Sequence, residues 1–304
     1  MRSPAADIRV DPELVRSLLA EQHPDLTGDL ELVANGWDNV IYRLGDDLAV
    51  RVPRREVAAH LIAHEQRWLP TLAASLPVPV PVPVRIGVPS ALFRWHWSVV
   101  RWFEGIDGAD VSASGRTQLA VPLARFVTAL HRPAPTAPNG RVHPDVPFNP
   151  VRGVPLRSRD AAVRERLREL QTDYDTGLLA ELWEESLAAP VWNGPPVWIH
   201  GDLHPGNLML DERGALAAVL DFGDLTAGDP ATDLATAWLT FRPESRAVFR
   251  ALVDDTTHTD ASTWLRARGW AICMGTSLAT SSDDNLRMRS LGAHVLGQLI
   301  FHDD

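Results

Sequence analysis

The hydrophobic and polar positions of the first hundred residues predict one helix followed by several short strands. Asp11-Pro12-Glu13 is typical of a helix start, because Asp caps the first turn and Pro fits within it. Further on, short apolar segments are separated by the turn signals Asn35-Gly36 and Gly45-Asp46-Asp47. The expected strands span residues 29–34, 39–44, 47–52, 84–88 and 96–103.

Residues 55–73 have the periodicity of an amphipathic helix. The apolar positions on its expected buried face are Val57, Leu61, Trp68 and Leu72. Prolines then occupy every second position from 77 to 83. Because proline lacks the backbone N–H and fixes φ, this segment is predicted to be an extended connector and not a helix or a central strand.

Beyond residue 117 the pattern becomes mostly helical, with expected helices over 158–172 and 175–188 and from about 230 to the end. A compact segment of strands and loops, residues 197–225, interrupts these helices. Gly105 and Gly108 mark the expected boundary between an N-terminal and a C-terminal part. The predicted fold class is therefore α+β.

Composition and charge narrow the class of protein. The chain has 304 residues, of which 45% are hydrophobic and 22% charged, so it is expected to be globular. With a single cysteine, Cys273, it can form neither an internal disulfide nor a cysteine-based zinc site. No apolar run is long enough to span a membrane and the N-terminus lacks the apolar core of a signal peptide, so we expect no membrane partner and a cytoplasmic location.

The net charge is -10, which argues against a nucleic-acid partner and favours a cationic or neutral small molecule. All 29 basic residues are arginines. Chemistry that needs a lysine amine is therefore excluded, and any phosphate-binding cation must be an arginine.

The segment 197–225 carries the candidate chemistry. An apolar strand leads into His200-Gly201-Asp202-Leu203-His204-Pro205-Gly206-Asn207, and a second apolar strand ends at Asp221-Phe222-Gly223. A carboxylate such as Asp202 can orient a hydroxyl group and accept its proton. The oxygens of Asn207 and Asp221 can hold Mg²⁺ against phosphate oxygens. In protein kinases, too, the catalytic Asp is followed five positions on by Asn and later by Asp-Phe-Gly.

The strings HGDLHPGNLML and VLDFGD resemble the aminoglycoside phosphotransferase family of the kinase-like superfamily, and the resemblance extends over residues 25–300. It implies a bilobal protein-kinase-like fold. Residues 1–104 would form a small, antiparallel-sheet lobe that binds the nucleotide, and residues 105–304 a larger, mostly helical lobe for catalysis and acceptor binding. It also implies that ATP, or GTP, and Mg²⁺ are the cofactors.

By the same resemblance, Asp202 would be the catalytic base, and Asn207 and Asp221 the metal ligands. His200 would brace the catalytic loop, and His204 would shape it. Asp229 and Asp233, on the helix that follows, would be mainly structural, since Asp229 can cap that helix.

The resemblance also assigns nucleotide contacts in the N-terminal part. Arg51 stands where the family usually has lysine, and the string Arg51-Val52-Pro53-Arg54-Arg55 is similar to that of macrolide phosphotransferases. Its expected partner is Glu65, which lies on the apolar face of the helix, whereas Glu56 lies on the polar face. The phosphate-covering loop would be residues 35–39, including Asn35 and Gly36. The segment 99–105, with Arg101 and Phe103, would be the hinge whose backbone binds adenine.

The acceptor is expected to be the hydroxyl group of a small molecule. Only Asp224 to Ala227 separate Asp-Phe-Gly from the next helix, so the long activation segment of protein kinases is missing and no protein substrate is expected. The acceptor pocket is expected near the loops 105–115 and 133–160. Candidate lining residues are Trp238, Trp264, Trp270, Asp283 and Asp284.

An aminoglycoside-type antibiotic is the first expectation for this acceptor, and acidic residues would suit such a polycation. A macrolide, a sugar or a choline-like metabolite are alternatives. A nucleotide-binding regulator without turnover is a different class, supported only by Arg51 and the glycine-poor loop. A metal-dependent phosphoesterase would need further His and Asp motifs, and the sequence upstream of His200 has none.

Overall fold

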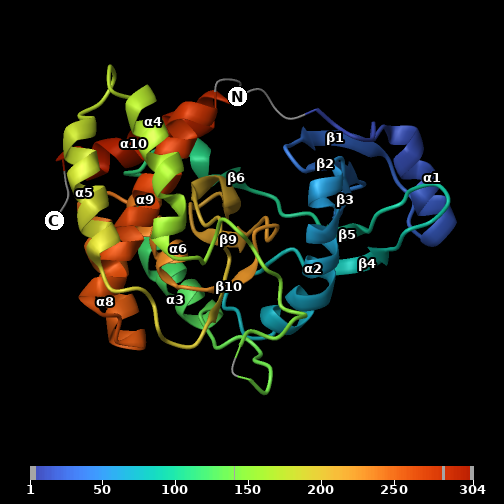
Figure 1. The fold of residues 1–304 in the computed structure, drawn as a ribbon. Coiled ribbons are helices and arrows are strands. Elements are labelled where there is room, and N and C mark those ends of the chain that lie inside the picture. The colour runs from blue at the N-terminus through green and yellow to red at the C-terminus, as the bar shows by residue number, and fades with distance from the viewer. Residues whose placement is uncertain (1–4, 140, 283–284, 302–304) are drawn as a thin grey trace. The chain divides into compact units, whose positions relative to one another are not determined.

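The computed structural model describes residues 5–139, 141–282 and 285–301, and its chain divides into two compact units (Figure 1). The first unit ends at Glu104 and the second begins at Gly105, and the short segment Leu76–Val78 groups with the second. A five-stranded sheet occupies the first unit, and the second is mainly helical.

The N-terminal unit is an antiparallel sheet with two helices. Its strands follow the order β1-β2-β3-β5-β4. Asp11 caps the first helix by accepting a hydrogen bond from the Leu14 N–H at 3.0 Å, as the Asp-Pro start predicts. The elements are α1 (Pro12–Gln22), β1 (Leu30–Asn35), β2 (Asn39–Leu44), β3 (Leu48–Pro53), α2 (Glu56–Ala73), β4 (Pro83–Gly87) and β5 (Trp97–Arg101).

Helix α2 buries a different face from the one predicted. Val57 is exposed, and Leu61 and Trp68 are only half-buried. The buried face instead consists of Ala58, Ile62, Glu65, Gln66, Leu69 and Leu72. Two of these positions are polar because their side chains bond to the sheet: Gln66 donates to the Trp97 carbonyl at 2.8 Å, and Glu65 pairs with an arginine of β3. An apolar stripe alone could not reveal such a face.

The C-terminal unit is built around the long helix α9 (Ala261–Ser281), which packs against α4, α5, α6 and α10. Asp260 caps α9 by accepting from the Thr263 N–H at 2.7 Å. Among the residues that the structure describes, no helix is long and apolar enough to cross a membrane. The other helices are α3 (Ala120–Leu130), α4 (Asp160–Glu169), α5 (Thr176–Ala188), α6 (Ala231–Leu234), α7 (Thr236–Thr240), α8 (Pro243–Thr257) and α10 (Leu286–Phe301).

Two small sheets accompany these helices. One joins β6 (Ile106–Asp107), β8 (Leu208–Leu210) and β9 (Leu216–Val219), and the other joins β7 (Val197–Ile199) to β10 (Thr226–Gly228). The sequence pattern does not predict β6 and β10, because both are too short to show periodicity and exist only through pairing with strands distant in sequence.

His294 on α10 should make stability depend on pH. Burial, together with the nearby guanidinium groups of Arg116, Arg242 and Arg246, lowers the pKa of His294 to about 4. In the unfolded chain this pKa is about 6.5, so the unfolded state binds more protons between these values. The contribution of His294 to the free energy of unfolding is therefore fully present above about pH 6.5. It is lost as the pH falls toward 4, which lowers the free energy of unfolding by up to about 3 kcal/mol.

Urea denaturation between pH 7 and pH 4 tests this prediction. The wild-type free energy of unfolding should fall more steeply than that of His294→Asn, which has no imidazole to protonate. Equal slopes for the two proteins would show that His294 is not the titrating group.

Candidate active site

The segment predicted to carry chemistry forms a strand, a tight loop and a hairpin. Strand β7 ends at Ile199, and the loop leads to the 3₁₀ turn η4 (Pro205–Asn207) and strand β8. Gly201 has a φ of 87°, and a Cβ at this position would come within 2.4 Å of the Asp224 carbonyl oxygen. Only glycine fits there without strain, which explains the His-Gly-Asp order.

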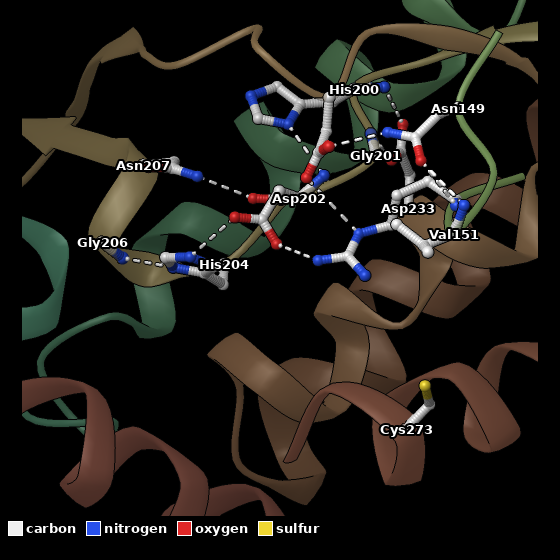
Figure 2. Close-up of polar contacts among 12 residues, drawn as sticks. Asn149, Val151, His200, Gly201, Asp202, His204, Gly206, Asn207, Asp233 and Cys273 are labelled. Carbon is white, nitrogen blue, oxygen red and sulfur yellow. Dashed lines mark hydrogen bonds and ion pairs between the residues drawn. The ribbon is translucent and has the colours of Figure 1, made fainter. Parts of the chain in front are cut away.

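Asp233 on α6 holds the start of this loop. Its side chain is fully buried and accepts hydrogen bonds from the backbone N–H groups of His200 and Gly201, both at 2.8 Å. His131 also contacts it through Nε2 at 3.1 Å. Figure 2 shows Asp233 beside Gly201. The structural role expected of Asp233 therefore has a geometric basis.

Replacing Asp233 by alanine is expected to lower the free energy of unfolding by about 2–4 kcal/mol, because two buried N–H groups would lose their acceptor. Urea denaturation measures this loss. The matched control is Asp255→Ala, an exposed position on α8, which should change stability by less than about 0.5 kcal/mol. Similar values for the two variants would contradict the bracing role.

His200 ties the loop to the end of β9. Its Nδ1 accepts from the Asp202 N–H at 3.2 Å, so its Nε2 carries the proton and donates to the Leu220 carbonyl at 2.9 Å. The ring packs on Phe222 with centroids 4.6 Å apart. The imidazole thus links the residue before the Asp-Phe-Gly sequence to the backbone of Asp202.

The Asp202 carboxylate is held by two side chains (Figure 2). Its Oδ2 lies 3.2 Å from His204 Nε2, and its Oδ1 accepts from Arg152 Nη2 at 3.0 Å. His204 Nδ1 accepts the Gly206 N–H at 3.0 Å, so Nε2 carries the proton that faces Asp202. An ionised carboxylate has about four acceptor sites, so a hydroxyl group can still donate to Asp202.

Electrostatics lower the pKa of Asp202 and keep it ionised, whereas they raise the pKa of the neighbouring Asp224. Burial opposes ionisation of Asp202, but His204 and Arg152 outweigh it and hold the pKa of Asp202 well below its usual range. At Asp224, burial and the carboxylates of Asp202 and Asp221 together raise the pKa, although Arg152 opposes them. Carboxylates with opposite shifts are typical of a functional site.

Arg152 is a site residue that sequence reasoning missed. It belongs to the loop 133–155, where Asn149 Oδ1 accepts from its backbone N–H at 3.1 Å and Asn149 Nδ2 donates to Asp224 at 2.7 Å. Besides Asp202, its guanidinium contacts Asp224 Oδ2 at 3.6 Å. The only local feature of the sequence near Arg152 is Asn149-Pro150, which predicts a turn. A turn does not indicate which residues the Arg152 side chain contacts.

Asn207 and Asp221 have the chemistry of magnesium ligands. Asn207 Nδ2 donates to the Asp202 carbonyl at 2.8 Å, which leaves Asn207 Oδ1 as an acceptor on the opposite side of the amide. The Asn207 carbonyl accepts from the Leu220 N–H at 2.8 Å, so the residue preceding Asp221 is bonded directly to Asn207. Asp221 itself is exposed and has the left-handed φ of 57°.

An amide oxygen and a carboxylate form a hard donor set that fits Mg²⁺, which keeps waters and takes phosphate oxygens for its other positions. No group of three or more His, Cys, Asp or Glu side chains suited to a metal occurs among the described residues. Asn207 and Asp221 therefore fit a Mg²⁺ ion that a nucleotide also coordinates, and not a metal site made of protein ligands alone.

The site residues predicted in the N-terminal unit fall in two places. Arg51 and Glu65 form a buried, bidentate ion pair, with Nη1–Oε2 at 2.5 Å and Nη2–Oε1 at 3.1 Å. Glu56, the alternative partner, is exposed and lies 3.7 Å from Arg94. Helical spacing thus identified the correct glutamate.

The predicted phosphate loop and hinge are ordinary backbone features of the same unit. Asn35 ends β1, and the Gly36 N–H donates to the Asn39 carbonyl at 3.0 Å, which closes the turn. Arg101 is exposed at the end of β5, and Phe103 is half-buried two residues later.

The expected acceptor-pocket tryptophans belong to the core instead. Trp238, Trp264 and Trp270 are all buried. Trp238 and Trp264 pack edge-to-face, with ring centroids 6.4 Å apart, and this packing stabilises the helices that carry them. Asp283 and Asp284 lie outside the described residues. Asp229 is buried and lies one residue before the cap of α6, Pro230, where it accepts from the Ala231 N–H at 3.0 Å and pairs with Arg266 at 2.6 Å.

Comparisons with known proteins agree with this description. Residues 29–270 match the model of the APH phosphotransferase enzyme family. No curated protein matches the chain significantly.

Solved structures with the same fold include two kinds of antibiotic phosphotransferase. A GDP complex of aminoglycoside 2'-phosphotransferase-IIIa is 20% identical, with a TM-score of 0.67, 95% of this chain covered and 98% of that one. Macrolide 2'-phosphotransferase MphH from Brachybacterium faecium is 21% identical, with a TM-score of 0.58 and coverage of 93% and 98%. A streptomycin–ATP complex of APH(2")-IIa is 17% identical, with a TM-score of 0.58 and coverage of 93% and 95%.

These likenesses confirm the predicted α+β, kinase-like fold, and the family match covers most of the sequence. The chain belongs to the APH phosphotransferase enzyme family, and it is a phosphotransferase that acts on a hydroxyl group.

Proposed function

We propose that the protein transfers the γ-phosphoryl group of ATP, or of GTP, to a hydroxyl group of a small molecule. The observation that carries this proposal is the position of Asp202, whose backbone carbonyl is bonded to the Asn207 amide in the loop that precedes Asp221. Nucleotide complexes among the structural neighbours support the choice of a nucleotide donor.

In this proposal Asp202 orients the acceptor hydroxyl and takes its proton as the bond to phosphorus forms. Asn207 and Asp221 would hold Mg²⁺, which supplies positive charge to the phosphate oxygens. His200 and His204 fix the Asp202 backbone and carboxylate, so that little reorganisation is needed when the acceptor arrives.

For the nucleotide, the proposal uses the N-terminal unit. Arg51, oriented by Glu65, would neutralise phosphate charge in place of a lysine. The backbone of the turn at Asn35 and Gly36 would cover the phosphates, and the segment around Arg101 and Phe103 would bind the base through its main chain.

The names of the structural neighbours support two acceptor classes. The aminoglycoside predicted from the sequence is supported by the aminoglycoside phosphotransferase structures, and a macrolide by MphH and by the Arg51–Arg55 string. The short Asp224–Ala227 segment supports a small acceptor of either class over a protein.

The test is phosphorylation of a panel of hydroxyl compounds by the purified protein with ATP and Mg²⁺, followed by mass spectrometry. The panel contains kanamycin, gentamicin, streptomycin, a macrolide, choline and simple sugars, each also in carboxylated or phosphorylated form where one exists. We expect at least one member to gain a phosphoryl group. If none does, and ATP is hydrolysed no faster than by Asp202→Ala, the protein is a nucleotide-binding regulator and the proposal is wrong.

A further inference from the structure

A cavity of about 60 Å³ lies beside Asp202 in the C-terminal unit, and its lining is rich in arginine. Arg152 comes from the loop before η3 (Leu156–Arg159), Arg159 from the last position of η3 and Arg166 from α4. Helix α9 contributes Cys273 and its neighbours to the lining; Figure 2 shows Cys273 below Asp202. Three arginines thus line a cavity that the candidate base, Asp202, lines as well.

The positive charge of this cavity exceeds the negative charge. Asp202 is the one carboxylate among the lining residues, and Arg152 already pairs with it. Within the described part of the chain, neither Arg159 nor Arg166 forms an ion pair. Arg166 donates only to the Cys273 carbonyl at 3.3 Å. The lining therefore has two cations without counter-charges.

Arg159 also has a buried donor with no acceptor among the described residues. Its Nε is shielded from solvent and has no hydrogen-bond partner there. An oxyanion in the cavity would offset the charges of Arg159 and Arg166 together, since arginine side chains match carboxylate and phosphate oxygens.

We propose that this cavity binds an acidic group of the acceptor, a carboxylate or a phosphate, next to the hydroxyl that is phosphorylated. The inference rests on the proposed transfer to a small-molecule hydroxyl group, and it favours an acidic acceptor over the aminoglycoside and macrolide classes named above. An acceptor anchored through its acid by Arg159 and Arg166 would present a nearby hydroxyl to Asp202, because the same cavity is lined by all three residues. A polycationic aminoglycoside would place ammonium groups against these arginines and is disfavoured here.

The net charge of -10 predicted the opposite preference, for a cationic or neutral partner. The net charge and the arginine-lined cavity act over different distances. Net charge governs solubility and long-range attraction, whereas recognition depends on the groups within a few ångströms of the ligand. The cavity therefore outweighs the composition as a guide to the acceptor.

Isothermal titration calorimetry with sulfate tests the anion site. The protein is first saturated with Mg²⁺ and a non-hydrolysable ATP analogue, so that nucleotide phosphate sites are already filled. We expect sulfate to bind the wild-type protein and to bind Arg159→Gln and Arg166→Gln roughly ten- to a hundredfold more weakly. Arg159→Lys, which keeps the charge, should bind better than Arg159→Gln.

The chain offers matched controls in the same elements. Arg157 in η3 and Arg168 in α4 are exposed and do not line the cavity. Arg157→Gln and Arg168→Gln should bind sulfate as the wild-type protein does, and circular dichroism should show that all variants are folded. If sulfate fails to bind, or if it binds all variants equally, the inference is wrong.

Two further outcomes separate this inference from the proposed function. If sulfate binds through Arg159 only when the nucleotide is absent, the arginines hold nucleotide phosphates and the inference fails. If a neutral or cationic acceptor is phosphorylated efficiently and sulfate does not compete with it, the proposed function stands while the acidic acceptor is refuted. If sulfate competes with the acceptor, so that KM for the acceptor rises and kcat does not fall, the result supports both the proposed function and the acidic acceptor.

Discussion

Replacing Asp202 by alanine is expected to slow phosphoryl transfer by roughly a hundred- to ten-thousandfold, the range typical of losing a general base. In the resting structure the carboxylate is ionised, since His204 and Arg152 lower its pKa, and it lies in the cavity where the acceptor would bind. Nucleotide affinity should change little, because Asn207 and Asp221 remain. The measurement is kcat with an acceptor identified from the panel, together with the dissociation constant of ATP.

Two variants sharpen this prediction. Asp202→Asn keeps the shape of the side chain but cannot take a proton, so it should be nearly as slow as Asp202→Ala. Glu212→Gln, in the exposed hairpin turn between β8 and β9, removes one carboxylate from the same segment and should retain full activity. If Asp202→Ala kept the wild-type kcat, Asp202 would not be the base.

The second large effect is expected at Glu65. Arg51 is 6% exposed and Glu65 1% exposed, and the two side chains share two short hydrogen bonds. Removing one partner of a buried ion pair leaves the other as an uncompensated charge, which costs about 3–5 kcal/mol. Glu65→Ala should lower the free energy of unfolding by about this amount and should also weaken ATP binding if Arg51 contacts the phosphates.

Urea denaturation of Glu65→Ala is compared with that of Glu56→Gln. Glu56 is on the same helix, but its side chain is 71% exposed, so its change should be within about 0.5 kcal/mol. The double variant Arg51→Met/Glu65→Leu removes both charges and should be more stable than Glu65→Ala alone. A loss below about 1 kcal/mol in Glu65→Ala would contradict the buried pair.

Much of this site could be predicted because its residues are close in sequence. Asp202 and Asn207 lie on one loop and Asp221 ends the neighbouring hairpin, so local spacing predicts that they meet. The strands of the N-terminal unit were predicted to within a few residues for a similar reason, since turn signals delimit them. Glu65 was identified because helical periodicity places it on a buried face even though the apolar residues predicted for that face were partly wrong.

The rest of the site depends on contacts between distant segments. Arg152, Arg159 and Arg166 line one cavity with Asp202, where Asn149 bonds to Asp224 and α4 packs on α9. No periodic pattern contains that information. The tryptophans were misplaced for the complementary reason, because a large aromatic side chain fits a core as well as a pocket and its sequence neighbours do not distinguish the two.

Binding of Mn²⁺ as a spectroscopic substitute for Mg²⁺ tests most directly whether these side chains serve one metal–nucleotide complex. Electron paramagnetic resonance would follow Mn²⁺ binding with the non-hydrolysable ATP analogue in the wild-type protein, Asn207→Ala, Asp221→Ala and the control Glu212→Gln. We expect both site variants to bind Mn²⁺ at least roughly tenfold more weakly than the wild-type protein and the control, as loss of a charge-bearing or amide oxygen ligand requires. Wild-type Mn²⁺ affinity in Asp221→Ala would contradict the assignment of the site.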